Sequence, residues 1–366
     1  MANLSVEICG LRCAHPVWPA AGPNVLDAAH ALRAAQGGAS ALVIKTISTR
    51  PARVPKPCMA RIGSDGLLNC ELWSELPAEQ YIEREYARAK SAGLPVIASI
   101  GYSAEELAEL GPRVEATGCV DAIEFSLHYT GHGHETLVAA ARALRGAVRL
   151  PIFAKLSPGM ADIGGVAAAL EPYVDGFAAV NSVGPAWAMN VEGGAALLGS
   201  EQGIGWLSGR PIKPVALRCV REVAQRVNKP VIGVGGIFSG SDAIEFIMAG
   251  ARAVQVCTAA ILRGPGIYGK IAREMAEWMD AHGCETLNDV RARGAAGVLS
   301  KSALDYEGRP PRIDHARCTR CGLCVTSCCP EALTLVGDGK KLLTLDEMRC
   351  VRCGLCRTVC PQGAIA

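Results

Sequence analysis

Short apolar runs alternate with longer amphipathic segments along the chain from about Pro16 to Ala281. Each run is followed by a segment rich in Ala, Glu and Arg, which is the pattern of strand–helix units around a parallel sheet. The runs that we expect to form strands are Pro16–Gly22, Ala41–Ile47, Pro95–Gly101, Ala122–Leu127, Pro151–Ser157, Gly176–Ser182, Pro230–Gly236 and Ala253–Ala259.

Eight such units are the number that closes a (β/α)8 barrel, so we predict an α/β fold of this kind. An open doubly wound sheet is the alternative, because strand counts from one sequence carry error. Two connections, 48–77 after the second expected strand and 183–213 after the sixth, are too long for simple turns. Both follow carboxyl ends of strands, which form the active-site face of a barrel, so both are candidate substrate lids.

The length of 366 residues allows one large domain and a small second one. We assign residues 1–311 to the barrel, with a linker from about residue 288, and residues 312–366 to a second domain. The stiff sequence Gly308-Arg309-Pro310-Pro311 marks the boundary. The formal net charge of +2 is spread without a basic stripe, which argues against a nucleic-acid partner. With no long apolar stretch and no leader, we expect a cytoplasmic protein without membrane contact.

Nine of the 17 cysteines lie between Cys318 and Cys360, which points to metal ligands in a reducing compartment. The run that begins at Cys318 recurs at Cys350 as an internal repeat of the type CxxCxxC. In such ferredoxin-like repeats three thiolates bind one [4Fe–4S] cluster and a fourth Cys reaches the other. We therefore predict a small α+β domain of the bacterial ferredoxin type with two clusters, whose ligands are Cys318, Cys321, Cys324 and Cys360, and Cys350, Cys353, Cys356 and Cys328.

Cys329 is the alternative to Cys328, because the first run ends in Cys328-Cys329-Pro330 whereas the second ends in Cys360-Pro361. Aligning Cys328 with Cys360 keeps the following apolar residues in register, so we favour Cys328. Structural zinc sites are a weaker alternative, since they use two CxxC pairs or mixed Cys and His ligands.

The ends of the seventh and eighth expected strands have the residues of a phosphate site. In barrels these loops offer backbone N–H groups to a cofactor phosphate, and glycines let the backbone approach it. The candidates are Ser208, Gly209, Gly235, Gly236, Cys257 and Thr258. Lys45 and Lys155 end two further strands, where a lysine is awkward to bury unless a cofactor needs it, although both could extend from the rim into solvent.

These residues, taken together, resemble the dihydroorotate dehydrogenases and, with the ferredoxin-like tail, the flavin half of dihydropyrimidine dehydrogenases. The resemblance covers nearly the whole chain and rests on segments such as Ala20-Ala21-Gly22, Ile44-Lys45-Thr46, Ala154-Lys155-Leu156, Val180-Asn181-Ser182 and Gly233-Val-Gly-Gly-Ile237. It implies FMN as the cofactor. By the same resemblance Ala21, Gly22, Lys45, Thr46, Ser126 and Lys155 contact the flavin, and Asn69, Asn181 and Ser182 bind the substrate.

The loop after the fourth expected strand departs from the family. The family has Asn-Leu-Ser-Cys-Pro there, whereas this chain has Ser126 in the Asn place and Tyr129 in the place of the catalytic Cys. We take Tyr129 as the first candidate for the general acid, with His128 and His132 next and Cys70 behind them. The segment Asn69-Cys70-Glu71-Leu72-Trp73 keeps the family Asn but not its Gly-Leu-Pro-Asn continuation.

The expected function is an FMN- and iron–sulfur-dependent oxidoreductase that acts on a C–C bond beside a carbonyl, as dihydropyrimidine dehydrogenases do. A non-pyrimidine cyclic or aromatic carbonyl substrate is the nearest alternative. From a different class comes an electron-transfer subunit without its own substrate. No GxGxxG strand–helix unit is present, so we expect electrons to pass to or from a pyridine-nucleotide-oxidising flavoprotein or a ferredoxin, and the resemblance implies a homodimer.

Overall fold

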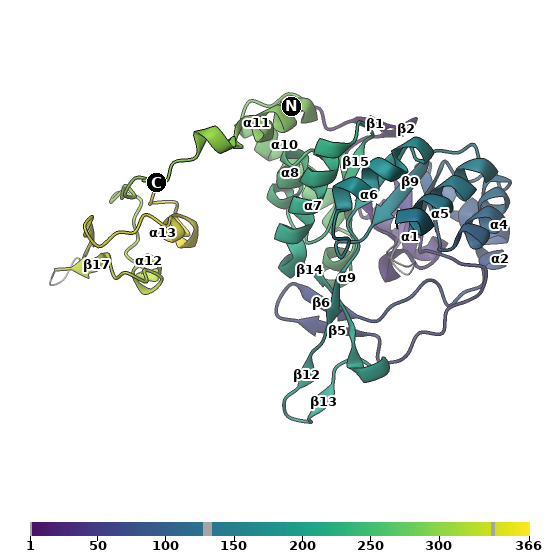
Figure 1. The fold of residues 1–366 in the computed structure, drawn as a ribbon, viewed down its shortest axis with the longest axis horizontal. Coiled ribbons are helices and arrows are strands. Elements are labelled where there is room, and N and C mark those ends of the chain that lie inside the picture. The colour runs from purple at the N-terminus through teal and green to yellow at the C-terminus, as the bar shows by residue number, and fades with distance from the viewer. Residues whose placement is uncertain (1, 127–133, 338–340) are drawn as a thin grey trace. The chain divides into compact units, whose positions relative to one another are not determined.

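The computed structural model describes residues 2–126, 134–337 and 341–366, which form two compact units (Figure 1). The units are Met1–Gly297 and Val298–Ala366. Residues 298–311, which the sequence suggested as part of the barrel domain, therefore group with the cysteine-rich unit. No helix in the described part of the chain is long and apolar enough to cross a membrane.

The first unit is built around one parallel sheet of eight strands. All eight strands expected from the sequence are confirmed, although each is shorter than its apolar run. In sheet order they are β3 (Val17–Pro19), β16 (Ala253–Val256), β15 (Val231–Val234), β10 (Gly176–Ala179), β9 (Ile152–Leu156), β8 (Ala122–Ser126), β7 (Val96–Ile100) and β4 (Leu42–Val43).

The two end strands of this sheet meet and nearly close it into a barrel. The N–H of Ser40, just before β4, donates to the carbonyl of Val17 in β3 at 3.3 Å. The fold is therefore a (β/α)8 barrel and not an open doubly wound sheet. Strands such as β8 and β9 are buried along their whole length, because side chains of one face fill the barrel and those of the other pack under the helices.

Helices surround the sheet (Figure 1). The longer ones each bury an apolar face against the strands, as the amphipathic pattern of their segments predicts. They are α1 (Ala28–Gln36), α3 (Tyr86–Lys90), α4 (Ala104–Glu115), α5 (His134–Ala147), α6 (Ile163–Leu170), α7 (Lys213–Arg226), α8 (Gly240–Met248), α9 (Thr258–Arg263) and α10 (Ile267–Ala281). The hairpin of β1 (Val6–Ile8) and β2 (Leu11–Cys13) packs against the amino-terminal end of the barrel interior.

The two long excursions pair with each other, which the sequence did not predict. The first forms β5 (Met59–Ile62) and β6 (Gly66–Asn69), and the second forms β11 (Val183–Ala186) and β14 (Gly205–Gly209). Strand β6 pairs with β14, so that all four make one antiparallel sheet in the order β11-β14-β6-β5. In Figure 1 this sheet extends from one end of the barrel, with the β12–β13 hairpin (Met189–Asn190 and Ala195–Ala196) beyond it.

Helix α11 (Leu287–Ala296) occupies the residues where we expected a linker to begin. Its first turn is fixed by a capping box of Thr286 and Asp289, and Leu287 and Val290 are buried. A Cβ on Gly294 would lie 2.5 Å from the carbonyl of Met248, so this helix packs closely on α8. We expected a linker in these residues because only two apolar residues, Leu287 and Val290, mark the buried face of the helix.

In its described residues the second unit contains two short α-helices, the 3-10 helix η6 (Lys301–Ala303) and one hairpin. Helices α12 (Leu323–Thr326) and α13 (Leu355–Val359) each follow a glycine with a left-handed backbone, Gly322 and Gly354. The hairpin pairs β17 (Leu333–Val336) with β18 (Leu342–Leu345). The matching helix starts show that the repeat in the sequence is also a repeat in the structure.

Candidate active site and cluster-binding unit

One pocket opens at the carboxyl ends of the barrel strands, beneath the antiparallel sheet of the two excursions. It gathers every cofactor- or substrate-binding residue that we proposed from the sequence and that the structure describes. These residues are Ala21, Gly22, Lys45, Thr46, Asn69, Ser126, Lys155, Asn181, Ser182, Ser208, Gly209, Gly235, Gly236, Cys257 and Thr258. Residues from Ala21 to Thr258 thus converge on one site, as the barrel topology requires.

One side of the pocket is lined by backbone at three glycines. Gly209, Gly235 and Gly236 have φ angles of 85°, 127° and 78°, which L side chains rarely adopt. A Cβ on Gly236 would lie 2.9 Å from the carbonyl oxygen of Gly209, so the two chain segments approach closely. The hydroxyls of Ser208 and Thr258 are 2.9 Å apart beside them. We call the wall formed by Ser208–Gly209, Gly235–Gly236 and Cys257–Thr258 the glycine cradle.

Lys155 is buried in the barrel mouth and is paired with Glu124. Its ammonium lies 3.1 Å from one Glu124 oxygen and 3.4 Å from Gln255 Oε1, and Gln255 Nε2 donates to the other Glu124 oxygen at 2.6 Å. All three side chains point into the barrel, because each lies two residues beyond an interior apolar residue on its strand. The alternative in which Lys155 reaches solvent is therefore excluded.

Lys45 forms a second buried ion pair, with Glu71 of the first excursion. Its ammonium donates to Glu71 Oε2 at 2.9 Å, and the Cys58 thiol donates to Glu71 Oε1 at 3.1 Å. Burial by itself would raise the pKa of Glu71, but the Lys45 charge and these hydrogen bonds hold that pKa below its usual value. Glu71 is therefore a carboxylate at neutral pH, exposed to the pocket.

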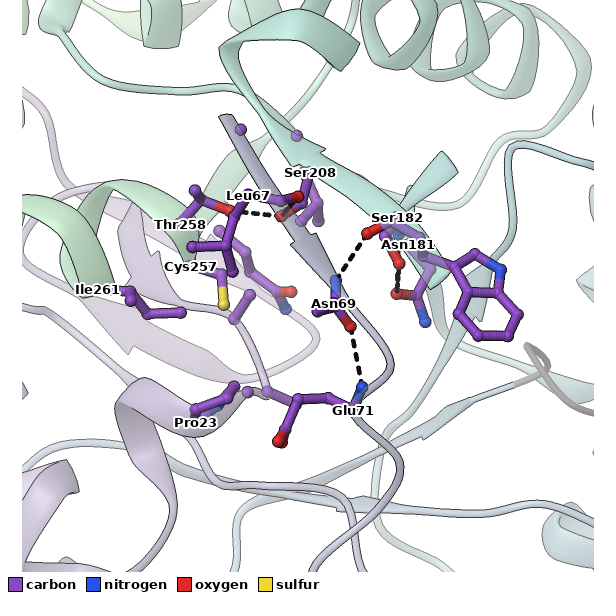
Figure 2. A pocket seen from close by; sticks show the side chains of 18 of the residues that line it. Pro23, Leu67, Asn69, Glu71, Asn181, Ser182, Ser208, Cys257, Thr258 and Ile261 are labelled. Atoms are coloured by element: carbon purple, nitrogen blue, oxygen red, sulfur yellow. Dashed lines mark hydrogen bonds between the residues drawn. The ribbon is translucent and has the colours of Figure 1, made fainter. Parts of the chain in front are cut away.

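Of the two proposed substrate-binding amides, Asn69 lies beside Glu71, and Asn181 lies beside Ser182 (Figure 2). Asn69 Nδ2 donates to the Trp206 carbonyl at 3.0 Å, and Asn69 Oδ1 accepts the Glu71 N–H at 3.2 Å. Asn181 Oδ1 accepts the N–H of Ser182 at 2.8 Å. These bonds fix the orientation of both amides, so that the pocket has preset donors and acceptors.

Large apolar side chains from the excursion sheet and from the barrel rim also line the pocket. They are Met59, Leu67, Leu72, Tyr102, Trp206 and Ile261. The ring of Tyr102 lies 5.4 Å from that of Trp73, at a tilted angle that suits an aromatic pair. A planar ring in the pocket would meet apolar walls there and polar groups at Asn69 and Glu71.

Tyr129, His128 and His132 lie outside the described residues, so their assignment as general acids stays a prediction. Cys70, the last candidate, is buried, and its thiol donates to the carbonyls of Pro55 and Pro57 at 3.8 and 3.9 Å. It does not line the pocket.

Three polar residues of the site were missed by the sequence analysis as site residues: Glu71, Glu124 and Gln255. A signal for the last two was present, since Glu124 and Gln255 each interrupt a short apolar run that forms a buried strand. A buried carboxylate needs a partner, and Lys155 on the adjacent strand provides one. Glu71 carried no comparable signal, because it lies in a connection whose path the sequence did not define.

The second unit places its thiols around two hollows. One hollow is lined by Cys318, Cys321, Cys324 and Cys360. The other is lined by Cys328, Cys350, Cys353 and Cys356. Cys329 is exposed and lines neither. Each group mixes three thiols of one repeat with one thiol of the other, as two [4Fe–4S] clusters of the ferredoxin type require.

The barrel site and the thiol groups together define a class of protein, the flavin-dependent iron–sulfur oxidoreductases. Comparison with known families agrees: residues 3–279 match the family described as Dihydroorotate dehydrogenase, and residues 317–364 match the 4Fe-4S dicluster domain. The chain therefore belongs to the dihydroorotate dehydrogenase family and has a dicluster domain at its carboxyl-terminal side. Membership makes it an oxidoreductase acting on CH–CH groups, with FMN and two [4Fe–4S] clusters as cofactors.

Curated relatives cover the barrel unit. The chain is 34% identical over 301 residues to the "Dihydroorotate dehydrogenase B (NAD(+)), catalytic subunit" of Thermoplasma acidophilum, which covers 79% of this chain and 98% of the relative. It is 33% identical over 298 residues to the protein of the same name from Methanothermobacter thermautotrophicus, covering 78% and 97%. The protein of that name from Geobacter sulfurreducens is 32% identical over 300 residues.

The residues present fit the cofactors that the family implies. The glycine cradle offers closely spaced backbone in conformations that a side chain would prevent, which suits a phosphate. Lys155, held by Glu124 and Gln255, places a cation deep in the same pocket, which suits the electron-rich edge of a flavin. The two groups of four thiols suit two cubane clusters.

Proposed function

We propose that this protein is a dihydropyrimidine dehydrogenase-like enzyme, which exchanges two hydrogens across the C–C bond beside a carbonyl in an uncharged cyclic amide such as dihydrouracil. FMN, held by the glycine cradle and by Lys155, would supply hydride chemistry and one-electron transfer to the clusters. For each dihydropyrimidine oxidised, the substrate loses one hydride and one proton, and two electrons leave through the clusters to a partner protein.

The observation that carries this proposal is Glu71. It brings a carboxylate to the wall of the pocket beside Asn69, where it can accept an N–H of a cyclic amide. The same carboxylate repels an anionic substituent. Lys45 and Lys155, the only cations among the described residues that line the pocket, already have carboxylate partners in Glu71 and Glu124. A substrate carboxylate, such as that of dihydroorotate, would therefore meet an unfavourable field.

In this proposal the other residues bind and orient. The glycine cradle holds the FMN phosphate, and Ala21, Gly22, Thr46 and Ser126 contact the flavin ring. Asn69, Asn181 and Ser182 hydrogen-bond the polar edge of the substrate, and the excursion sheet excludes water above it. Tyr129, with His128 and His132 as alternatives, exchanges the proton at the carbon next to the hydride site.

The electron partner is proposed to be a pyridine-nucleotide-oxidising flavoprotein or a ferredoxin. The named relatives are catalytic subunits, which by that description work with another subunit. We propose also that the chain forms a homodimer in the cytoplasm. Size-exclusion chromatography with light scattering tests whether the chain is a homodimer, and a monomer would contradict this part of the proposal.

A substrate with a larger ring than a pyrimidine is a second candidate. The apolar rim of Met59, Leu72, Tyr102 and Trp206 is what favours it, because a small cyclic amide uses little of this surface. Such a compound would still need an N–H or O–H donor to pair with Glu71. The two candidate substrates differ in the size of the ring, but both are uncharged.

The test is anaerobic reduction of the bound flavin. The holoenzyme is mixed with dihydrouracil, dihydrothymine or dihydroorotate, and the flavin absorbance near 450 nm (an approximate, generic band) is followed. Bleaching by dihydrouracil or dihydrothymine and not by dihydroorotate supports the proposal. Bleaching by dihydroorotate alone contradicts it. If none of them bleaches a flavin that dithionite reduces fully, the substrate lies outside the pyrimidines.

A further inference from the structure

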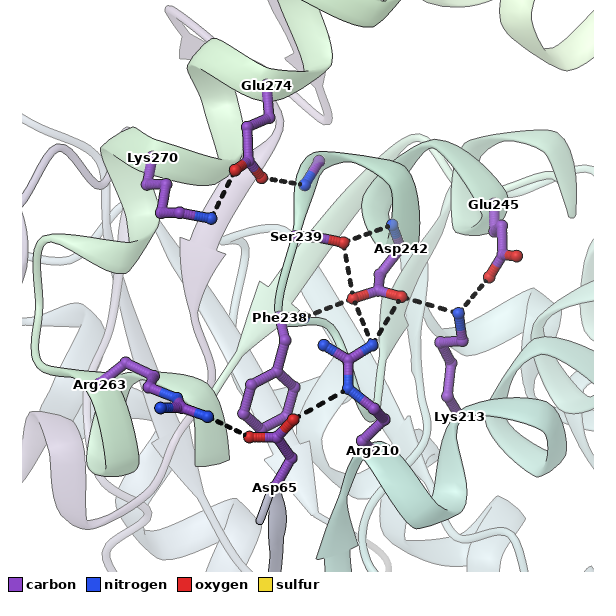
Figure 3. Close-up of polar contacts among 11 residues, drawn as sticks. Asp65, Arg210, Lys213, Phe238, Ser239, Asp242, Glu245, Arg263, Lys270 and Glu274 are labelled. Atoms are coloured by element: carbon purple, nitrogen blue, oxygen red, sulfur yellow. Dashed lines mark hydrogen bonds and ion pairs between the residues drawn. The ribbon is translucent and has the colours of Figure 1, made fainter. Parts of the chain in front are cut away.

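A network of charged side chains lies behind the glycine cradle and has no part in the proposed chemistry (Figure 3). It joins the tip of the β5–β6 hairpin to three segments of the barrel rim. Its members are Asp65, Arg210, Lys213, Asp242, Glu245 and Arg263. None of them lines the pocket itself.

Asp65 links two arginines from different segments. Its Oδ2 lies 3.2 Å from Arg210 Nε, and its Oδ1 lies 2.5 Å from Arg263 Nη2. Its carbonyl oxygen also accepts the Arg210 N–H at 2.9 Å. The Arg263 and Arg210 guanidinium groups hold the pKa of Asp65 below its usual value, so the carboxylate stays ionised at neutral pH.

Both arginines lie in chain segments that also contribute residues to the glycine cradle. Arg210 directly follows Gly209 and begins the short helix η5 (Arg210–Ile212). Arg263 ends α9, the helix that begins at Thr258. A Cβ on Gly209 would lie 2.2 Å from the Asp65 carbonyl oxygen, so the hairpin tip is in direct contact with the cradle backbone. Asp65 therefore ties two of the three cradle segments to the hairpin.

The third cradle segment joins the same network through Asp242. Arg210 Nη1 lies 3.3 Å from both Asp242 oxygens, and Asp242 Oδ2 accepts the N–H of Phe238 at 3.0 Å. Phe238 follows the Gly235–Gly236 turn by two residues. The network therefore reaches every segment of the cradle from outside the pocket.

The charges of the network balance, with three cations against three anions, so it offers a bound anion little net attraction. The network can therefore affect an anion in the cradle only by holding the backbone of the three cradle segments in place. Binding is tighter when the groups that contact a ligand are held in place before it arrives.

We propose that Asp65 is a positioning residue for the FMN phosphate: from the tip of the first excursion it holds the backbone donors of the glycine cradle in their binding arrangement. This inference rests on the proposed placement of the phosphate in the cradle. It also gives the first excursion a second role besides covering the substrate, since its hairpin supports cofactor binding.

The test compares FMN with riboflavin, which lacks the phosphate. Full-length protein is freed of flavin, and each ligand is titrated while quenching of flavin fluorescence is followed. Asp65→Asn should raise the Kd for FMN by at least about tenfold, since a tenfold change needs only ~1.4 kcal/mol, and should leave the Kd for riboflavin within about twofold. Asp65→Glu should recover most of the loss. Arg263→Gln, which removes one of the two ion pairs, should act in the same direction by a smaller factor.

Glu79→Gln serves as the control, because it breaks the exposed Glu79–Arg113 ion pair elsewhere on the barrel surface. It should change neither Kd. If Asp65→Asn weakens the binding of FMN and of riboflavin by the same factor, the proposal is overturned, and Asp65 is a general stabiliser of the fold. Tighter FMN binding would also overturn it, because the released arginines would then act as phosphate ligands. If the unmodified protein binds both flavins equally, the cradle assignment itself fails, and the role of Asp65 fails with it.

Discussion

The Lys45 ammonium and the Glu71 carboxylate lie 2.9 Å apart, although they come from a barrel strand end and from the first excursion. The pair joins the part of the site where we place the flavin to the part where we place the substrate. It also shows that the cation expected from the sequence reaches the pocket already partnered. The preference for uncharged substrates that we propose depends on this pairing.

Glu71→Gln should lower kcat/KM for dihydrouracil by about 10- to 100-fold, because a charge-assisted hydrogen bond to the substrate is replaced by a weaker one. It should also reduce the discrimination against dihydroorotate, since the repulsive charge is gone. The measurement is steady-state kinetics with both compounds. Glu75→Gln is the matched control, because Glu75 lies in the same excursion and pairs with Lys56 at the exposed surface.

Lys155→Met should shift the midpoint potential of the bound flavin to a more negative value and weaken the sulfite adduct of the flavin by at least about tenfold. A cation near the electron-rich edge of the flavin stabilises the reduced form, and methionine removes it while keeping most of the volume. Redox titration and sulfite titration measure the two effects. Lys90→Met, at the half-buried Lys90–Asp121 pair outside the pocket, is the control. An unchanged potential in Lys155→Met would place the flavin elsewhere.

Tyr129→Phe should slow flavin reduction by the substrate by about 10²- to 10⁴-fold, the range for loss of a general acid or base. Reduction by dithionite should not change, because it needs no proton exchange with the substrate carbon. Stopped-flow spectroscopy separates the two reactions. If His128→Ala or His132→Ala shows the large effect and Tyr129→Phe does not, the acid is a histidine.

Cys328→Ser should reduce the content from two clusters to one, whereas Cys329→Ser should keep both. Cys328 lines the hollow of the second thiol group, and the adjacent Cys329 is exposed and does not. Iron and acid-labile sulfide analysis of anaerobically purified protein gives the count. The two variants control for each other, and the reverse result would assign Cys329 as the ligand.

Asp242→Asn should lower the free energy of unfolding by about 3 kcal/mol at neutral pH, because the buried Phe238 N–H loses its charged acceptor and Lys213 loses the more buried of its two carboxylate partners. Burial opposes ionisation of Asp242, but the hydrogen bonds and charge of Lys213 and the Phe238 N–H keep its pKa below the usual value. A depressed carboxyl pKa contributes stability above the unfolded pKa of about 3.9 that disappears as the pH falls through the folded value.

The difference between Asp242→Asn and the unmodified protein should therefore be constant from about pH 6 to 8 and shrink below about pH 4. Urea unfolding followed by tryptophan fluorescence reports this, since all five tryptophans lie in the first unit. Glu79→Gln should show no comparable difference at any pH. If the difference in the free energy of unfolding stays the same down to about pH 3, packing and not charge accounts for the lower stability of Asp242→Asn.

The barrel strands could be found from the sequence because each is buried on both faces. Such strands give continuous apolar runs, as in Ile152–Leu156, and eight of them between amphipathic segments leave little choice of fold. The glycines and lysines of the site were found for a related reason, since they interrupt these patterns at the strand ends, where a barrel has its active site.

The pairing of the excursions could not be found in this way. Trp206 pairs with Asn69 in the β14–β6 ladder, and nothing local in either segment specifies a partner so distant in the chain. The position of Glu71 depends on that ladder, because the residue lies just beyond the end of β6. The sequence could therefore predict the glycines and lysines of the pocket and the amides Asn69 and Asn181, while the position of Glu71 required the structure.

The β6–β14 ladder has a consequence for any attempt to change the substrate by exchanging loops. Each excursion completes the hydrogen bonding of the other, so replacing one alone would leave a row of unpaired backbone groups along a sheet edge. It would also remove either Glu71 or Trp206, the residue that pairs with Asn69. A functional graft from a relative must therefore carry both excursions together, and natural variants of this barrel should be expected to exchange or lose them as one inherited unit.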